Sequence, residues 1–297
     1  MDILFGPVPS RRYGQSLGID LVPMKTCCYD CLFCQLGPTP KTTLERRDYI
    51  PLSAVYQALS AWLAKCIPVD MLTLCGSGEP TLHAHFGDVL KWIANETDKP
   101  SLLMSNGALF ADPNVRRDAA LATRTKISIH FWDEASFQQT VRPHSGLSFQ
   151  SIYEGWQAFR VDYKGMLDVE FFALPGMNTS EEQLSRIRDL IAPLAPDTIT
   201  VNAAERPPAE SCVKCIAQDE KEKLRTFFAT IASERPSIAP QSTIAYSEAA
   251  LLALARRHPL TPEQFATYFN QPVALIRDVL MRYADEDPFA ARALKHS

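Results

Sequence analysis

Residues 25–37 read KTCCYDCLFCQLG and hold Cys27, Cys31 and Cys34 in a Cx3Cx2C spacing. Three thiolates on one short loop can bind one face of a metal cluster. A [4Fe–4S] cube has four irons, so three cysteines leave one iron without a protein ligand. That iron can bind a substrate or a cofactor, as the open position of a catalytic zinc does. The spacing therefore predicts an iron–sulfur site with an open coordination position.

The alternative for these cysteines is structural zinc or a set of free thiols. Structural zinc usually takes four ligands in two pairs. Cys28 directly follows Cys27 and is poorly placed as a fourth ligand, but Cys212 and Cys215 could supply a second pair. This second pair could also bind an auxiliary cluster or remain as redox-active thiols, so its role stays open.

Composition predicts a globular protein with one sizeable core and a small appendage. The chain has 297 residues, 46% of them apolar and 22% charged, and a net charge of −4, which gives no general attraction to nucleic acid. The N-terminal stretch MDILFGPVPSRRYG has prolines where a signal peptide is apolar, and no run approaches the ~18–20 apolar residues of a membrane span. We therefore expect a cytoplasmic protein without membrane association, whose eight cysteines serve metal binding or catalysis rather than disulfides.

Short apolar runs alternate with segments of helical spacing along most of the chain. The expected strands are residues 16–22, 69–75, 101–105, 126–131, 167–174 and 198–202. The expected helices between and after them are residues 51–65, 86–94, 113–122, 134–141, 149–163, 180–191 and 219–231. This alternation predicts an α/β fold with a parallel sheet, because each parallel crossover needs a helix. Six units are too few for a closed eight-stranded barrel.

The C-terminal part of the chain looks like a separate module. We expect a core domain of residues 1–235, a linker of residues 236–245 and a module of residues 246–297 with helices at 247–257, 261–269 and 272–284. Short helices with tight turns resemble a helix-turn-helix or winged-helix module. Acidic residues balance Arg277 and Arg282 of its third helix, whereas DNA-reading helices are usually basic. Docking to a protein or packing on the core is favoured over DNA binding.

The cysteine loop also resembles a known family. With Phe33 before the last cysteine, it has the Cx3CxΦC form of the cluster loop of the radical S-adenosylmethionine (SAM) enzymes. Residues 6–37, GPVPSRRYGQSLGIDLVPMKTCCYDCLFCQLG, look like the opening of one branch related to the 4-demethylwyosine synthases of tRNA modification. The resemblance covers about residues 6–210. It implies a partial (β/α)6 TIM-like barrel, a [4Fe–4S] cluster on the three cysteines, and SAM bound to the fourth iron.

The stretch CGSGEPTL after the second expected strand is the next candidate. Gly76 and Gly78 allow the backbone to approach a ligand closely, and backbone carbonyls with Glu79 supply the acceptors that an ammonium group needs. The segment from Gly76 to Pro80 resembles the family's glycine-glycine-glutamate motif, which holds the amino group of SAM, with Ser77 in place of the second glycine. The alternative is an ordinary loop between a strand and a helix.

Polar residues near the ends of the next two strands are further candidates, because ligands of parallel α/β folds bind at the carboxyl ends of the strands. Ser105 and Asn106 could bind the ribose or carboxylate of SAM, or form a plain turn. Ser128 and His130 share one face of a strand, and the serine resembles a family contact to ribose or carboxylate. The alternative for His130 is a core histidine. Relatives tend to have an aspartate soon after the serine, whereas here it is delayed to Asp133.

Four later residues complete the set of candidates. Arg142 and Arg206 follow expected strands and could each pair with a carboxylate in a bidentate manner, or be surface groups. From the resemblance, Gly176 corresponds to a glycine turn near the adenine, and Val201 could offer backbone groups to the same base.

The resemblance implies an enzyme. An electron from a reduced flavodoxin or ferredoxin would cleave SAM to methionine and a 5′-deoxyadenosyl radical, which abstracts hydrogen from a substrate. A tRNA base is the first expectation, by kinship alone; a protein or peptide, including a glycyl-radical enzyme to be activated, is the second. The demethylwyosine synthases carry further cysteines before the SAM loop, and none precedes Cys27 here. A hypothesis of a different class is an iron–sulfur sensor that binds DNA through its C-terminal helices.

Overall fold

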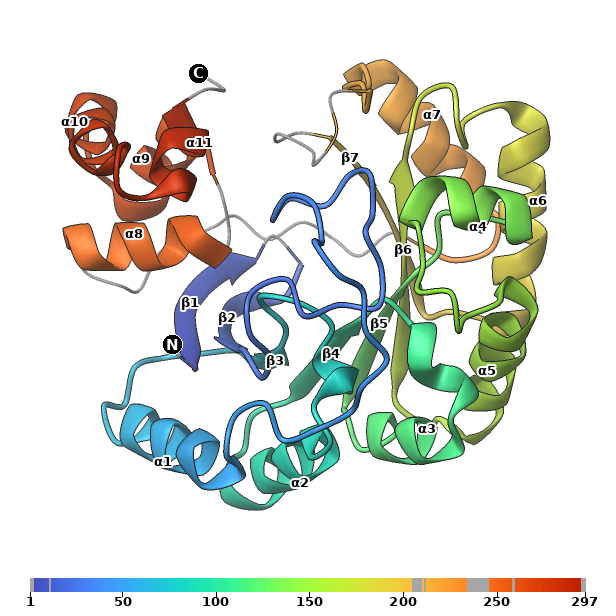
Figure 1. Cartoon of the computed structure of the whole chain (residues 1–297), viewed down its shortest axis with the longest axis horizontal. Coiled ribbons are helices and arrows are strands. Elements are labelled where there is room, and N and C mark those ends of the chain that lie inside the picture. Colours follow the sequence, from blue (N-terminus) through green and yellow to red (C-terminus); the bar gives the residue numbers. More distant parts are fainter. Residues whose placement is uncertain are drawn as a thin grey trace.

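The computed structural model describes residues 3–10, 12–204, 210, 212–233, 246–257 and 260–294. This part of the chain contains a seven-stranded sheet in which the strands follow their sequence order (Figure 1). Its strands are β1 (Leu4–Ser10), β2 (Gly14–Ile19), β3 (Met71–Leu74), β4 (Ser101–Ser105), β5 (Arg124–Ser128), β6 (Met166–Ala173) and β7 (Thr198–Ala203). β1 is antiparallel to β2, and each later neighbour pair is parallel.

Helices α1–α7 lie along the outside of the sheet, and α8–α11 form a group beside β1 (Figure 1). The helices are α1 (Leu52–Leu63), α2 (Phe86–Glu96), α3 (Pro113–Ala119), α4 (Glu134–Val141), α5 (Phe149–Asp162), α6 (Glu181–Ile191), α7 (Gln218–Phe228), α8 (Glu248–Arg257), α9 (Pro262–Phe269), α10 (Val273–Tyr283) and α11 (Pro288–Leu294), with short 3-10 turns η1 (Pro80–Leu82), η2 (Ala108–Ala111) and η3 (Ala192–Leu194). The predicted α/β fold with an open, partial barrel and C-terminal helices is confirmed.

Several boundaries differ from the prediction. β1 was not among the expected strands; it contains Pro7 and Pro9, which an edge strand tolerates because it need not donate every N–H as a central strand must. β5 begins earlier than predicted and ends at Ser128 rather than at residue 131, and α11 was not predicted. The predicted linker of residues 236–245 lies outside the described residues, so the division into domains remains a prediction.

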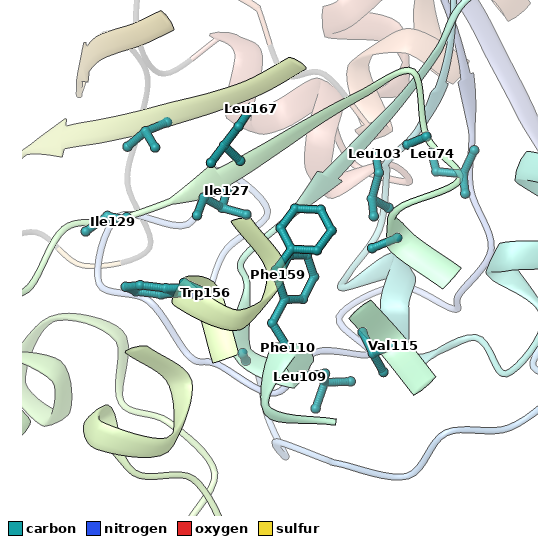
Figure 2. Packing of buried hydrophobic residues seen from close by; sticks show 14 of the residues in the cluster. Leu74, Leu103, Leu109, Phe110, Val115, Ile127, Ile129, Trp156, Phe159 and Leu167 are labelled. Carbon is teal, nitrogen blue, oxygen red and sulfur yellow. The ribbon is translucent and has the colours of Figure 1, made fainter. Parts of the chain in front are cut away.

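The main core lies between the sheet and its helices. Figure 2 shows strand residues such as Ile127 and Leu167 above the rings of Phe110, Trp156 and Phe159, all of them buried. Burial of each such side chain stabilises the fold by roughly 1.5–3 kcal/mol. Alternate residues along the strands therefore point outward to the helices, and the residues between them line the inner face of the sheet.

Polar contacts across the inner face show how strongly the sheet curves. The Tyr13 hydroxyl, in the turn between β1 and β2, donates to the Asp168 carboxylate of β6 at 2.9 Å, and Arg124 of β5 pairs with the same carboxylate at 2.5 Å. In a flat sheet, β2 and β6 would lie roughly 19 Å apart, at about 4.8 Å per strand. The sheet therefore closes most of a barrel, and the turn before β2 fills its bottom.

The C-terminal helices pack on β1. Val8 shares an apolar cluster with buried residues of α8–α11, and the Tyr268 hydroxyl donates to the Pro7 carbonyl at 2.6 Å. A capping box opens α9, with Thr261 and Gln264 each bonding the other's backbone N–H. Packing on the core was one of the two favoured roles for this module. No helix among the described residues has the length and apolarity to cross a membrane.

Candidate functional site

The cysteine loop joins β2 to α1 and is anchored to the end of α4. The backbone N–H of Leu32 donates to Thr140 O at 3.1 Å, and that of His144 donates to Cys28 O at 2.9 Å. Strands β2 and β5 point their carboxyl ends to the same edge of the sheet, so these bonds hold the loop across that edge. The loop lies where the sequence predicted a ligand site.

The three predicted cluster ligands differ in solvent exposure from Cys28, the fourth cysteine of the loop. Cys27, Cys31 and Cys34 are partly exposed, whereas Cys28 is buried. Burial raises the pKa of Cys31, and the neighbouring Cys34 and Cys27 thiols raise it further. The three proposed ligands are thus more accessible than Cys28.

The donor set fits a cluster better than a single ion. Among the described residues, no group of three His, Cys, Asp or Glu side chains is placed to hold one metal ion. Thiolates around a single zinc lie roughly 3.8 Å apart, because each is 2.3 Å from the same ion in a tetrahedron. A cube binds each cysteine through a different iron and needs a wider spacing. Cys27, Cys31 and Cys34 lie on one loop, and each could bind a different iron of such a cube.

Glu79 joins the loops that follow β3 and β4. Its buried carboxylate accepts hydrogen bonds from the Thr81 N–H and hydroxyl at 3.1 and 2.6 Å, from the Ser105 hydroxyl at 2.8 Å and from the Asn106 N–H at 2.8 Å. Burial raises the pKa of Glu79, and these hydrogen bonds partly oppose that effect. Three of the four bonds fall on Oε1, so Oε2 keeps capacity to accept another.

The two glycines of this loop permit contacts that a side chain would block. Gly76 has φ +146°, and a Cβ there would lie 2.4 Å from the carboxyl carbon of Asp20; a Cβ on Gly78 would lie 1.9 Å from Thr26 O. Asp20 also accepts from the Ser77 N–H at 3.0 Å and hydroxyl at 2.5 Å. Sequence reasoning missed Asp20, although a lone acid in the apolar run SLGIDLV was a signal.

The turn after β4 reaches the cysteine loop. Asn106 Nδ2 lies 3.2 Å from Cys28 Sγ and 3.6 Å from Cys27 Sγ. The Ser105 hydroxyl donates to Glu79 and accepts from the Gly107 N–H at 3.0 Å, so it supports the turn rather than facing a ligand. The structure thus brings together the cysteine loop, the loop after β3 and the turn after β4.

Ser128 belongs to a charged cluster on the inner face. Its hydroxyl donates to Glu170 at 3.3 Å, Lys126 pairs with Glu170 at 2.8 Å, and the Asn202 amide donates to the other carboxylate oxygen. Burial would raise the pKa of Glu170, but Lys126 holds it at about 2. Sequence reasoning missed Lys126, Glu170 and Asn202, although polar residues alternate along all three strands.

His130 is a buried, oriented histidine. Its Nδ1 accepts from the Phe172 N–H at 2.9 Å, so the neutral ring carries its proton on Nε2. Burial lowers the pKa of His130 to about 4. Phe33 meets the ring edge-to-face at 4.8 Å and stacks on Phe172 at 4.5 Å, so this apolar wall adjoins the last cysteine. Asp133, by contrast, caps α4 by accepting from the Ser136 N–H at 2.8 Å.

Arg142 connects the cysteine loop to the segment after β7. Its guanidinium lies 2.9 Å from the carboxylates of both Asp30 and Glu210, and its Nε donates to Asp30 O at 2.9 Å. Both carboxylate partners come from the protein, so the observed contacts of Arg142 hold the cysteine loop to the segment after β7. Arg206 lies outside the described residues.

The remaining candidates are placed differently from one another. The Val201 side chain is buried in the core between the sheet and the helices, so only its backbone groups could contact a ligand on the inner face of the sheet. Gly176 has φ +81° and nothing within 4 Å of a Cβ, so its turn is open. Cys212 and Cys215 are exposed, while Val213 between them packs with Leu32 of the cysteine loop.

No model of a known protein family matches the chain. Among solved structures, TYW1 with a bound lysine–pyruvate adduct has a TM-score of 0.58 at 16% identity, over 73% of this chain and 74% of that one. SuiB of Streptococcus suis bound to the precursor peptide SuiA has a TM-score of 0.55 at 15% identity, over 73% and 48%. A radical SAM methyltransferase from Sphaerobacter thermophilus has a TM-score of 0.52 at 14% identity, over 74% of this chain and 66% of that one. The chain has the fold of the radical SAM enzymes, as the cysteine loop predicted.

Curated relatives identify the family within that class. A UPF0026 protein of Methanocaldococcus jannaschii is 34% identical over 216 residues, which is 72% of this chain and 67% of the relative. One of Helicobacter pylori strain J99 is 30% identical over 279 residues, covering 89% and 87%. The chain belongs to the UPF0026 family. It also matches a GTPase Obg of Brachyspira hyodysenteriae at 29% identity over 95% of this chain, but spans only 42% of that relative's length. No GxxxxGK[ST] phosphate loop occurs in the present sequence.

Proposed function

We propose that this protein is a radical SAM enzyme in which Cys27, Cys31 and Cys34 hold a [4Fe–4S] cluster beside a SAM site. The observation that carries the proposal is the meeting of the three-cysteine loop with the Glu79 loop and the Asn106 turn at one end of the sheet. SuiB bound to SAM and anSMEcpe with bound AdoMet, with TM-scores of 0.54 and 0.50, share the fold and support it. When bound, a reduced cluster supplies the electron that cleaves SAM to methionine and a 5′-deoxyadenosyl radical, which takes hydrogen from the substrate.

The residues of the chain bind, orient and exclude water. Glu79 Oε2 would accept a hydrogen bond from the amino group of bound SAM, while the bonds from Ser105 and Asn106 keep the carboxylate in place. Phe33 and Phe172 form an apolar wall against the nucleoside, and neutral His130 offers Nε2–H as a donor. Ser128 and the glycine turn at Gly176 would complete the surroundings of the cofactor.

The deciding experiment is anaerobic reconstitution with iron and sulfide, reduction with dithionite and addition of SAM. The proposal expects a [4Fe–4S]⁺ EPR signal that changes with SAM, and 5′-deoxyadenosine by chromatography. Cys31→Ala should abolish both, and Cys66→Ala, at an exposed cysteine outside the loop, should retain both. Bound zinc without a cluster, or a cluster that does not cleave SAM, would refute the proposal.

The substrate is proposed to be a tRNA base and the electron donor a cytoplasmic flavodoxin or ferredoxin. Kinship with TYW1-like proteins supports the base, whereas SuiB, solved with its precursor peptide, keeps a peptide as the second candidate. A deletion strain should lack one modified tRNA nucleoside; an unchanged nucleoside profile would eliminate tRNA. Glycyl-radical activation belongs with the protein alternative.

The DNA-binding sensor is disfavoured by the charges of α10. Arg277 pairs with Glu263, and Arg282 pairs with Glu248, each at 2.5 Å, so both arginines are neutralised within the module. SAM cleavage without DNA retention at moderate salt would eliminate the sensor.

A further inference from the structure

Lys25 places a cation on the cysteine loop. Its Nζ donates to Cys34 Sγ at 3.0 Å and to the Gly37 carbonyl at 2.6 Å. The ammonium group thus lies within hydrogen-bond distance of the sulfur of one proposed cluster ligand. These two contacts connect the end of the loop, at Cys34 and Gly37, with its beginning at Lys25.

The backbone of Lys25 is held in an unusual conformation. Its φ is 62°, in the left-handed region, which costs a lysine roughly 1–2 kcal/mol. The loop after β3 maintains this turn, because the Lys25 N–H donates to Ser77 O at 2.7 Å and the Glu79 N–H donates to Thr26 O at 3.0 Å. Glycine would adopt this turn with less strain, so a lysine here indicates a use for the side chain.

We infer that Lys25 raises the reduction potential of the cluster. This inference rests on the proposed function. Reduction adds one negative charge to a cluster that its thiolate ligands already make anionic, and a nearby cation stabilises the reduced state more than the oxidised one. A hydrogen bond to a ligand sulfur acts in the same direction. Asp30 on the same loop is paired with Arg142 at 2.9 Å, so it does not cancel the ammonium charge.

The consequence concerns electron supply. A higher potential lets a flavodoxin or ferredoxin reduce a larger fraction of the cluster before SAM is cleaved. Lys25 is therefore a positioning residue for charge and not a catalytic residue, because its contacts are to the protein ligand and not to the reacting atoms.

The test is an EPR-monitored redox titration of the reconstituted full chain without SAM. Lys25→Met should make the midpoint potential more negative by about 59 mV, which corresponds to a tenfold change in the one-electron equilibrium. Lys25→Gln keeps an N–H donor without the charge and should shift the midpoint by less, and Lys25→Arg should stay near wild type. Lys99→Met removes an equal charge from a lysine paired with Asp98 just before β4, at the opposite end of that strand, and should not shift it.

Equal midpoints for Lys25→Met and wild type would overturn the inference. If Lys25→Met holds no cluster, equal midpoints for Lys25→Gln and Lys25→Arg would overturn it instead. A weaker SAM affinity with an unchanged midpoint would assign the ammonium to SAM and also overturn it. A wild-type protein that forms no [4Fe–4S] cluster would refute the proposed function itself, whereas a cluster indifferent to residue 25 refutes only the role of Lys25.

Discussion

Gly78→Ala tests whether the loop after β3 must touch the segment before the cysteines. The new Cβ would lie 1.9 Å from Thr26 O, and such contacts essentially never fall below 3.0 Å, so one backbone must move by about 1.1 Å. That movement breaks or stretches the bonds from Glu79 N to Thr26 O and from Lys25 N to Ser77 O, now 3.0 and 2.7 Å. Each bond contributes about 0.5–1.5 kcal/mol and the overpacking costs about 1–3 kcal/mol. Together these terms predict a loss of about 2–6 kcal/mol in the free energy of unfolding.

Equilibrium urea unfolding measures this loss, and calorimetry of SAM binding to the reconstituted protein measures its effect on the site. Gly176→Ala is the matched control, because residue 176 has φ +81° but open space around a Cβ. Gly176→Ala should lower the free energy of unfolding only by the cost of a positive φ for alanine, roughly 1–2 kcal/mol. If Gly78→Ala is no more destabilising than Gly176→Ala and leaves SAM affinity unchanged, the argument for a required close contact is wrong.

Three further predictions test other parts of the fold. Glu79→Ala leaves the backbone and hydroxyl donors that now bond to the carboxylate without an acceptor. It should lower the free energy of unfolding by about 3 kcal/mol, measured by urea titration, and weaken SAM binding, measured by calorimetry. The pKa of Glu170 is lowered from 4.5 to about 2, so its ionised carboxylate contributes about 3 kcal/mol of stability above pH 4.5, which is lost as the pH falls toward 2. The free energy of unfolding should therefore fall more steeply with decreasing pH for wild type than for Glu170→Gln. Tyr268→Phe loses the bond to Pro7 O and should cost about 1 kcal/mol in thermal unfolding, with SAM cleavage unchanged.

Each of these has a result that contradicts it. Glu79→Ala with normal stability would mean that the four bonds are not formed in solution. Parallel acid-unfolding curves for Glu170→Gln and wild type would mean that the Lys126 pair does not stabilise the carboxylate. A Tyr268→Phe variant with full stability would show that the C-terminal helices do not depend on the contact with β1.

Local signals predicted much of the fold. The strand at residues 101–105 and the helix at 134–141 have the predicted bounds, and the helix expected at 180–191 begins with a capping box of Ser180 and Gln183. These elements depend on apolar spacing and on bonds between residues three or four apart, which a single sequence displays. The glycines at 76 and 78 were also identified, because the segment resembles the family's glycine-glycine-glutamate motif.

Contacts between distant segments were not predictable in the same way. β1 pairs with β2 although its prolines argue against a strand, and nothing in the local pattern reveals that it is an edge. Arg142 was considered as a partner for a ligand carboxylate, but Asp30 lies 112 residues away in sequence and becomes its neighbour only when the cysteine loop crosses to α4. The charged cluster around Glu170 likewise depends on strand pairing, because Lys126 and Asn202 are 44 and 32 residues away from it in sequence and become its neighbours only in the sheet.

Glu79 shows why a motif residue cannot be assigned a single role from its motif. The resemblance predicts that it faces the amino group of SAM, and the fold uses the same carboxylate to join two loops through four hydrogen bonds. The two roles depend on each other, because an oxygen that is not held in place would bind an ammonium group less selectively. A loss of SAM binding in Glu79→Ala therefore needs the stability measurement beside it, because the same carboxylate is expected to serve both the fold and the ligand.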